Sequence, residues 1–160
     1  MLLQLELPSN PEMLCVVRSA VMRLTEEFGF SDEQCRALTR AVDEALANVI
    51  RHAYGGRPGR PIEISCRHVQ ERSGAQRDGL EIVLIDHGKS ADGKKWCGRP
   101  LDDIRPGGLG LHFIQDAVDL MQYSSRFHTN RLRLVKYLDS VTSDSQAQAP
   151  APKIAEGNKP

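Results

Sequence analysis

AVDEALANVIRHAY, residues Ala41–Tyr54, is the stretch from which the rest of the fold can be worked out. Its aliphatic side chains continue a spacing of three and four residues that starts upstream, which predicts an amphipathic helix with one buried face. Glu44 and Asn48 lie four residues apart on another side of that helix, and Arg51 and His52 follow one turn later. The predicted buried stripe consists of Cys35, Leu38, Val42, Ala45 and Val49.

The limits of this helix can also be predicted. Ser31, with a glutamine three residues later, has the pattern of a capping box, and Gly55-Gly56 should end the helix. Upstream, Asn10 is expected to cap an earlier amphipathic helix that ends near Gly29. The alternating segment Leu3–Leu7 comes before it and predicts a strand with one buried face.

A second informative stretch, IVLIDHG, spans residues 82–88. Its nearly continuous apolar run predicts a central strand that ends at Asp86. A carboxylate at a strand end can accept hydrogen bonds from a ligand, and Gly88 would let the backbone pass close to a flat ring. An ordinary strand-to-loop turn explains the same residues, because Asp and Gly both favour turns.

The third stretch is Gly107-Gly108-Leu109-Gly110, at the start of a further helical pattern. Exposed backbone N–H groups and the positive end of a helix dipole suit a phosphate group, although a flexible loop and cap is an equal alternative. The spacing is neither GxGxxG nor GxxxxGK[ST], so neither a Rossmann fold nor a P-loop is indicated. The loop Lys89–Pro106 before it carries basic side chains, Arg105 among them, which are either phosphate contacts or a solvated charged surface.

Two further strands, Gln122–Phe127 and Arg131–Leu138, are expected around a turn at His128–Asn130. The predicted element order is β-α-α-β-β-α-β-β. It indicates an α/β (α+β) fold class, a two-layer sandwich of three helices on one mixed, mainly antiparallel sheet. Residues 1–138 are predicted to form one domain. Residues 139–160 have too few large aliphatic side chains to form a core and are predicted to be a disordered C-terminal tail.

Composition narrows the function classes. The 160 residues carry 21 Lys and Arg against 21 Asp and Glu, so the chain lacks the cationic surplus of a direct nucleic-acid binder. No apolar run approaches the roughly 20 residues of a membrane-spanning helix and no signal peptide is recognisable, so we expect a cytoplasmic protein without a membrane partner. The 4 cysteines form no CxxC pair, which argues against a zinc ribbon or redox motif.

Taken together, the three stretches resemble the three boxes of the gyrase, heat-shock chaperone, histidine-kinase and mismatch-repair ATPase superfamily. Within it, AVDEALANVIRHAY, IVLIDHG and RPGGLGLHFIQDAVD are most similar to the anti-sigma factor serine/threonine-protein kinases of bacterial partner-switching systems. The closing LRLVKYL resembles the last strand of that family. The resemblance covers the predicted domain and none of the tail, and it implies a histidine kinase-like ATPase fold that binds ATP.

The resemblance also implies roles for particular residues. Glu44 matches the general-base glutamate, and Asn48 matches the asparagine that coordinates Mg²⁺. Asp86 matches the aspartate that accepts from the adenine amino group, with Gly88 beside the ring. The phosphate-wrapping backbone matches Gly107, Gly108 and Gly110, with the basic Arg105 just before them. In the box that begins at Asp86, the wider superfamily has a second glycine two residues after the position of Gly88. Ser90 occupies that position here, a departure that the anti-sigma kinase branch often shares.

The function implied is that of an ATP-binding anti-sigma factor and serine/threonine kinase that phosphorylates a STAS-domain anti-anti-sigma partner. The same resemblance implies a sigma factor or another effector as a second partner, and a role for the first helix in pairing two copies or contacting a partner. An alternative remains open: a non-catalytic nucleotide-binding module that regulates a sigma factor or other effector by sequestration only. Substitution of Glu44 by alanine would distinguish the two functions, because only the kinase needs its carboxylate.

Overall fold

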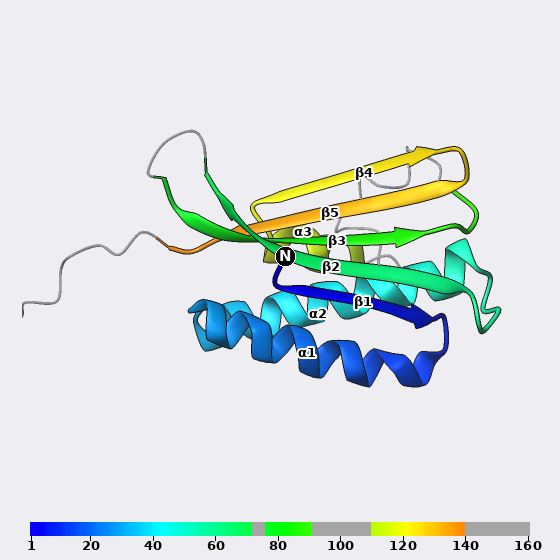
Figure 1. The fold of residues 1–160 in the computed structure, drawn as a ribbon, viewed down its shortest axis with the longest axis horizontal. Helices are drawn as coiled ribbons and strands as arrows, with labels where there is room; N and C mark the ends of the chain where they lie inside the picture. The colour runs from blue at the N-terminus through cyan, green and yellow to red at the C-terminus, as the bar shows by residue number, and fades with distance from the viewer. Residues whose placement is uncertain (72–75, 91–109, 140–160) are drawn as a thin grey trace, which may run out of the picture.

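The computed structural model describes residues 1–71, 76–90 and 110–139. Residues 91–106 of the predicted basic loop, Arg105 among them, lie outside the described residues, as do Gly107, Gly108 and residues 140–160 of the predicted tail. The helices and strands follow the predicted order, β-α-α-β-β-α-β-β (Figure 1). Their bounds are β1 Leu3–Pro8, α1 Leu14–Phe28, α2 Asp32–Asn48, β2 Pro61–Gln70, β3 Asp78–Asp86, α3 Gly110–Ala117, β4 Leu120–Arg126 and β5 Thr129–Tyr137.

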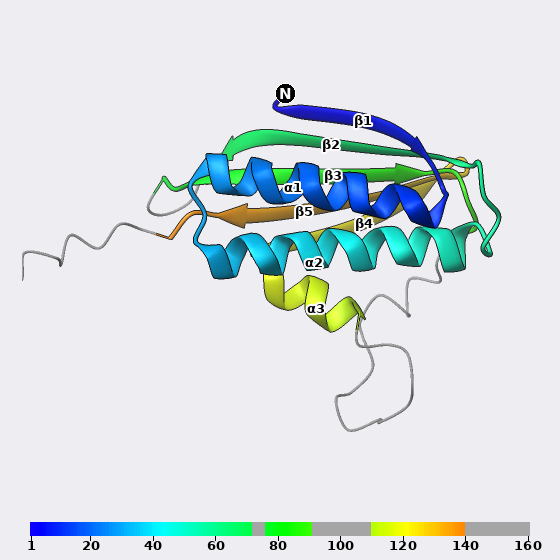
Figure 2. The same cartoon turned by 90° about the horizontal axis from the view of Figure 1, so that it is seen from below.

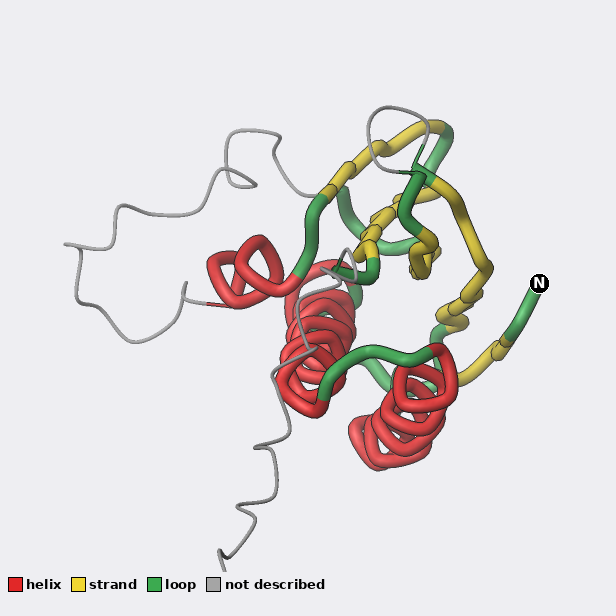
Figure 3. The backbone as a smooth tube through the Cα atoms, turned by 90° about the vertical axis from the view of Figure 1, so that its left-hand side faces the viewer, coloured by secondary structure: helices red, strands yellow, loops and turns green. Residues whose placement is uncertain are grey.

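The five strands form one sheet in the order β1-β2-β3-β5-β4. Every pairing is antiparallel, so the two-layer α/β sandwich is confirmed, while the mixed part of the predicted sheet is not found. The three helices cover one face, with α2 between α1 and α3 (Figures 2 and 3). β3 lies in the middle of the sheet and α2 in the middle of the helical layer, so the elements that carry Asp86 and Glu44 belong to facing layers.

The helix ends follow from local chemistry. Ser31 accepts a hydrogen bond from the Gln34 backbone and Gln34 bonds back to Ser31, so the predicted capping box is present at α2. Gly29 ends α1 in the left-handed region with φ 99°. Asn10 does not cap α1 with its side chain: a short 3₁₀ turn, Pro11–Met13, intervenes before the α-helix begins.

The core lies between the sheet and α2, as the stripe predicted. Alternate side chains of β2 and β3 enter it from the sheet, and the spaced apolar positions of α2 enter it from the helix. The largest fully buried side chains include Leu38, Leu46, Ile62, Ile64, Ile82 and Leu84. This packing ties the end of β3 to the far end of α2, which sets the position of the candidate site.

The predictions near the C-terminal hairpin need correction. The turn is the two-residue Phe127-His128, and Asn130 is a buried residue of β5 rather than part of the turn. The spacing of Leu111, Ile114, Val118 and Met121 predicts the inner face of one helix, yet Met121 lies in β4 because α3 ends at Ala117. Over so short a stretch, the spacing of apolar residues fits a helix and a strand equally well. The sequence alone therefore does not show where α3 ends and β4 begins.

On the face of the sheet away from the helices, Glu81 is only 1% exposed. Its two carboxylate oxygens accept hydrogen bonds from the Nε atoms of Arg67 and Arg133, on the strands to either side. Burial alone would raise the pKa of Glu81, but the two arginines outweigh it and the pKa is held below its usual range. This ion triad joins β2, β3 and β5.

Across the described residues, none of the helices combines the length and apolar character needed to cross a bilayer.

Candidate nucleotide site

The first wall of the site is the C-terminal part of α2. Glu44 and Asn48 occupy successive turns, and Asn48 is the last α-helical residue. A π-helical turn, Val49–Ala53, continues from it and stops at Tyr54. Sequence periodicity predicted one helix to about Tyr54, and the structure places the change of helical geometry directly after Asn48. Such π turns occur frequently at functional sites.

Gly110, the first residue of α3, approaches Glu44 closely. A Cβ atom placed on Gly110 would lie 2.7 Å from Oε2 of Glu44. The glycine therefore allows the carboxylate to lie against the start of α3, where backbone N–H groups of the first turn have no partner within the helix. The structure thus brings together two residues that are 66 positions apart in the sequence, Glu44 and Gly110.

The second wall is the end of β3, where Asp86 is 7% exposed. Its Oδ1 accepts hydrogen bonds from the Gly88 N–H at 2.9 Å and from Nδ2 of Asn130 at 2.8 Å. No described residue donates to Oδ2. Asn130 faces Asp86 across the β3–β5 pairing, and its own Oδ1 accepts from the Tyr123 hydroxyl at 3.1 Å. The carboxylate is thus held in place while one oxygen keeps its accepting capacity.

Gly88 is required for a reason that the sequence did not suggest. A Cβ atom on Gly88 would lie 2.5 Å from the carbonyl oxygen and 2.7 Å from the Cβ of Ala53. The neighbouring Lys89 N–H donates to the same carbonyl oxygen at 2.8 Å. The backbone after β3 therefore packs directly on the end of the π-helical turn, and only glycine fits this approach.

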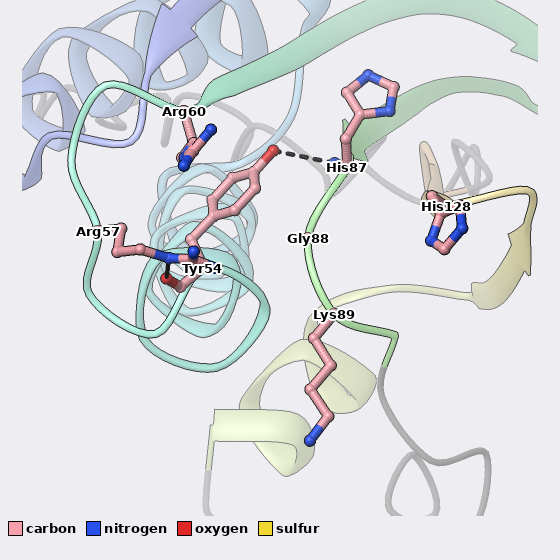
Figure 4. Close-up of a pocket in the computed structure, with 7 residues that line it drawn as sticks. All are labelled: Tyr54, Arg57, Arg60, His87, Gly88, Lys89 and His128. Atoms are coloured by element: carbon pink, nitrogen blue, oxygen red, sulfur yellow. Dashed lines mark hydrogen bonds between the residues drawn. The ribbon is translucent and has the colours of Figure 1, made fainter.

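Tyr54 also stabilises this contact between the π-helical turn and the backbone after β3. Its ring is 3% exposed, and its hydroxyl donates to the Pro61 carbonyl at 2.5 Å and accepts from the His87 N–H at 2.9 Å (Figure 4). Burial raises the pKa of Tyr54, and the negative charge of Asp86 adds to the rise. The phenol therefore stays protonated and connects the start of β2 to the residues after β3.

These contacts define the length of the site. The end of β3 packs on α2 and its π-helical turn at Ala53, and the start of α3 packs on α2 at Glu44. The two points are nine residues apart, or roughly 13 Å along a helix. Asn48 lies between them, with Asp86 at one end and Gly110 at the other. The described site therefore has the buried carboxylate of Asp86 near one contact, Asn48 on the helix between the two contacts, and the carboxylate of Glu44 at the other contact.

The family model described as the histidine kinase-like ATPase domain matches residues 7–136. This chain belongs to that family. Two relatives place it more finely. Serine-protein kinase RsbW of Bacillus pumilus is 29% identical over 126 residues, covering 74% of this chain and 75% of the relative. Serine-protein kinase RsbW of Listeria innocua is 32% identical over 123 residues, covering 72% and 74%. The chain is therefore a histidine kinase-like ATPase of the anti-sigma factor kinase family, and the predicted resemblance is confirmed.

A solved structure agrees on the fold. The RsbU and RsbW domains of a Mycobacterium tuberculosis protein match with a TM-score of 0.54 and 14% sequence identity, over 84% of this chain. This chain spans only 32% of that longer protein. At such low identity the likeness bears on the fold alone, and there it supports the histidine kinase-like ATPase architecture.

For this histidine kinase-like ATPase, the structure describes five of the predicted site residues, and it shows Glu44 against Gly110 and Asp86 bonded to Gly88, with Asn48 on the helix between these two contacts. The other three, Arg105, Gly107 and Gly108, lie outside the described residues. Sequence reasoning missed Asn130 and Tyr54 as supports of the site. Pairing Asp86 with the strand that ends the domain would have pointed to Asn130, whereas nothing in the sequence marked the contacts of the Tyr54 hydroxyl.

Proposed function

We propose that this protein binds Mg-ATP and transfers the γ-phosphoryl group to a serine or threonine of a STAS-domain anti-anti-sigma partner. The observation that carries the proposal is the close approach of Gly110 to the Glu44 carboxylate, at the opposite end of the site from Asp86. Membership of an ATP-binding kinase family supplies the nucleotide, and the serine-protein kinase relatives support the type of reaction.

Binding of the base would use Asp86. Its Oδ1 is already committed to Asn130 and Gly88, so Oδ2 is the atom to accept from the adenine amino group. This contact would favour adenine over guanine. Guanine has a carbonyl oxygen where adenine has its amino group, and that oxygen would face the Asp86 carboxylate, so two acceptors would meet without a proton between them. Asn130 and Tyr123 keep the carboxylate oriented without touching the base in this proposal.

The residues present fit a magnesium ion. An amide oxygen from Asn48 is the kind of hard oxygen ligand that Mg²⁺ takes together with phosphate oxygens and water. When bound, the ion neutralises the charge of the phosphates. The N-terminal backbone of α3 would add its partial positive charge to the same phosphates.

Glu44 would act as the general base. Its carboxylate accepts the proton of the partner's hydroxyl while that oxygen bonds to the γ-phosphorus. The bond from the γ-phosphorus to the bridging β–γ oxygen breaks, and ADP leaves. A sigma factor or another effector is proposed as the protein that is released or captured when the STAS partner changes its phosphorylation state.

The test uses the full chain, γ-labelled ATP and a panel of purified STAS-domain proteins. Glu44→Gln should keep ATP binding and abolish label transfer to the partner, while Glu33→Gln, in the exposed first turn of the same helix, should transfer normally. Transfer by Glu44→Gln at the rate of the unmodified protein would refute the assigned role. No transfer by the unmodified protein, with ATP still bound and the effector still regulated, would leave sequestration as the function.

A further inference from the structure

A pocket lies at the end of the sheet next to Asp86, and its lining shares Gly88 with the proposed nucleotide site. It has a volume of about 310 Å³ and is lined by Tyr54, Arg57, Arg60, His87, Lys89 and His128, together with the Gly88 backbone (Figure 4). We call it the basic pocket. Its residues come from the loop after the π-helical turn, the segment after β3 and the turn between β4 and β5, three parts of the chain that fold to one end of the molecule.

The charges of the basic pocket are unbalanced. Its lining includes no carboxylate, and the one carboxylate in ion-pair range of a lining side chain within the described residues is Glu63, whose Oε1 lies 3.8 Å from Nε2 of His87. Within the described part of the chain, the side chains of Arg60 and Lys89 make no hydrogen bond or ion pair. Arg57 uses only its Nε, which donates to the Tyr54 carbonyl at 3.0 Å. For a chain of zero formal net charge, this local surplus of cations is a distinct feature, and free guanidinium groups are suited to carboxylates.

A second, independent feature adjoins the pocket. Phe127 and His128 form a two-residue hairpin turn in which both have positive φ, 50° and 62°. Such turns favour Asn-Gly, because large side chains are strained in the left-handed region. The Phe127 side chain is nevertheless 96% exposed and contributes nothing to the core. An exposed aromatic side chain in a strained turn is the kind of outlier that points to binding.

We propose that the basic pocket and Phe127 together dock an acidic segment of a partner protein. Carboxylates of the segment pair with Arg57, Arg60 and Lys89, and an apolar side chain of the segment packs on Phe127. The cations are spread along the pocket rather than aimed at one point, since Lys89 extends away from Arg60 (Figure 4). Spaced cations suit several carboxylates along a chain better than one phosphate group, and a small anion would make no use of the aromatic ring.

This docking surface does not depend on phosphoryl transfer. Arg57 and Arg60 have no assigned role toward the nucleotide, whereas Lys89 belongs to the loop considered for phosphate contacts and Gly88 contributes only through the backbone, so the test substitutes Arg60 alone. Its substitution should therefore leave ATP affinity unchanged, which separates a failure of this proposal from a failure of the proposed kinase reaction.

The test is a titration of the full chain with a labelled synthetic peptide rich in glutamate and aspartate, with leucines at intervals. Binding should weaken with added salt and should shift the amide resonances of residues 57–60, 87–89 and 127–128. Arg60→Glu should lower the affinity by at least about tenfold, because the reversed charge repels the acidic segment. Arg36→Glu, an exposed arginine on α2, is the matched control and should bind as the unmodified protein does.

Further arms decide the nature of the ligand. Phe127→Ser should weaken peptide binding several-fold with no loss of thermal stability, since the side chain is exposed. The proposal is overturned if the charge-reversal variant and Arg36→Glu bind the peptide equally, or if the shifted amides lie elsewhere. Displacement of the peptide by inorganic phosphate at matched ionic strength would also overturn the proposal, because the pocket would then be a small-anion site. So would a failure of the peptide to bind while the chain self-associates through this surface.

Discussion

Replacing Gly88 and Gly110 by alanine, one at a time, adds the same methyl group at the two ends of the site, with opposite expected results. At Gly88 the new Cβ would lie 2.5–2.7 Å from the backbone carbonyl and the Cβ of Ala53, none of which can rotate away. At Gly110 it would lie 2.7 Å from Oε2 of Glu44, the end of a flexible side chain that can rotate away. Neither glycine is among the residues with positive φ, so space rather than backbone strain decides both results.

Gly88→Ala should therefore destabilise the fold. Overpacking against atoms that cannot rotate away costs about 1–3 kcal/mol, and this corresponds to a melting temperature about 3–12 °C lower for a domain of this size. ATP affinity should fall as well, since the Gly88 N–H holds one oxygen of Asp86. Gly110→Ala should keep stability within about 1 kcal/mol of the unmodified protein, because alanine favours a helix more than glycine does. Its phosphoryl transfer should fall about 10- to 100-fold, since the proposed base is displaced from its position.

Calorimetric melting, ATP titration and label transfer to the STAS partner measure the three quantities on the same two variants. An unchanged melting temperature for Gly88→Ala would mean that the backbone after β3 does not pack on Ala53 as described. Full transfer activity in Gly110→Ala would show that the position of Glu44 against α3 is irrelevant to the reaction. A loss of stability in both variants, with activity per folded molecule unchanged, would leave both glycines as packing residues only.

Three further predictions concern the rest of the molecule. Replacing Phe127-His128 by Asn-Gly should raise the free energy of unfolding by about 1 kcal/mol or more, because both residues have positive φ; lower stability in urea would refute the strain. Glu81→Gln should cost about 1.5–3 kcal/mol at neutral pH. Because the pKa of Glu81 is lowered from 4.5, its contribution is present above that pH and is lost as the pH falls through the lowered pKa, so the variant should show a shallower acid limb in pH-dependent melting. In a Cys97→Ser background, a thiol reagent should modify Cys15 in the native protein and leave Cys66 unmodified. Cys66 is buried, and burial raises its pKa to about 12. Prompt modification of Cys66 in the native protein would contradict this.

Most of the fold could be predicted from the sequence because the strongest sequence patterns are long and periodic. The stripe of α2, the capping box at Ser31 and the apolar run of β3 each involve several residues that agree, so one misjudged position could not change the result. The C-terminal hairpin shows the opposite case. Its turn contains neither Asn nor Gly, so the usual signal of a two-residue turn is missing, and the predicted turn was displaced onto the buried Asn130.

The site could be predicted as a set of residues but not as a structure. Asp86 and Gly88 were recognisable as the end of a strand, while the roles of Asn130 and Tyr54 depend on which strands pair and on where a helix changes its geometry. Gly88 is the clearest instance, because the sequence suggested room for a flat ring and the structure shows room for the Ala53 carbonyl. Close approaches between segments far apart in sequence leave no periodic signal, since each involves a single residue.

The use of α2 as the fixed element explains why two such approaches occur. Its buried face is locked into the core by Leu38, Val42 and Leu46, so the backbone that carries Glu44 and leads on to Ala53 cannot shift to accommodate a misplaced neighbour. The neighbours must adjust instead, and each does so by presenting a glycine at the point of contact. A rigid helix that carries Glu44, the proposed general base, is approached at both ends by glycine backbone, and this arrangement keeps the separation between Asp86 and Glu44 constant. Such constancy is what phosphoryl transfer demands when one end of a nucleotide is held and the other end reacts.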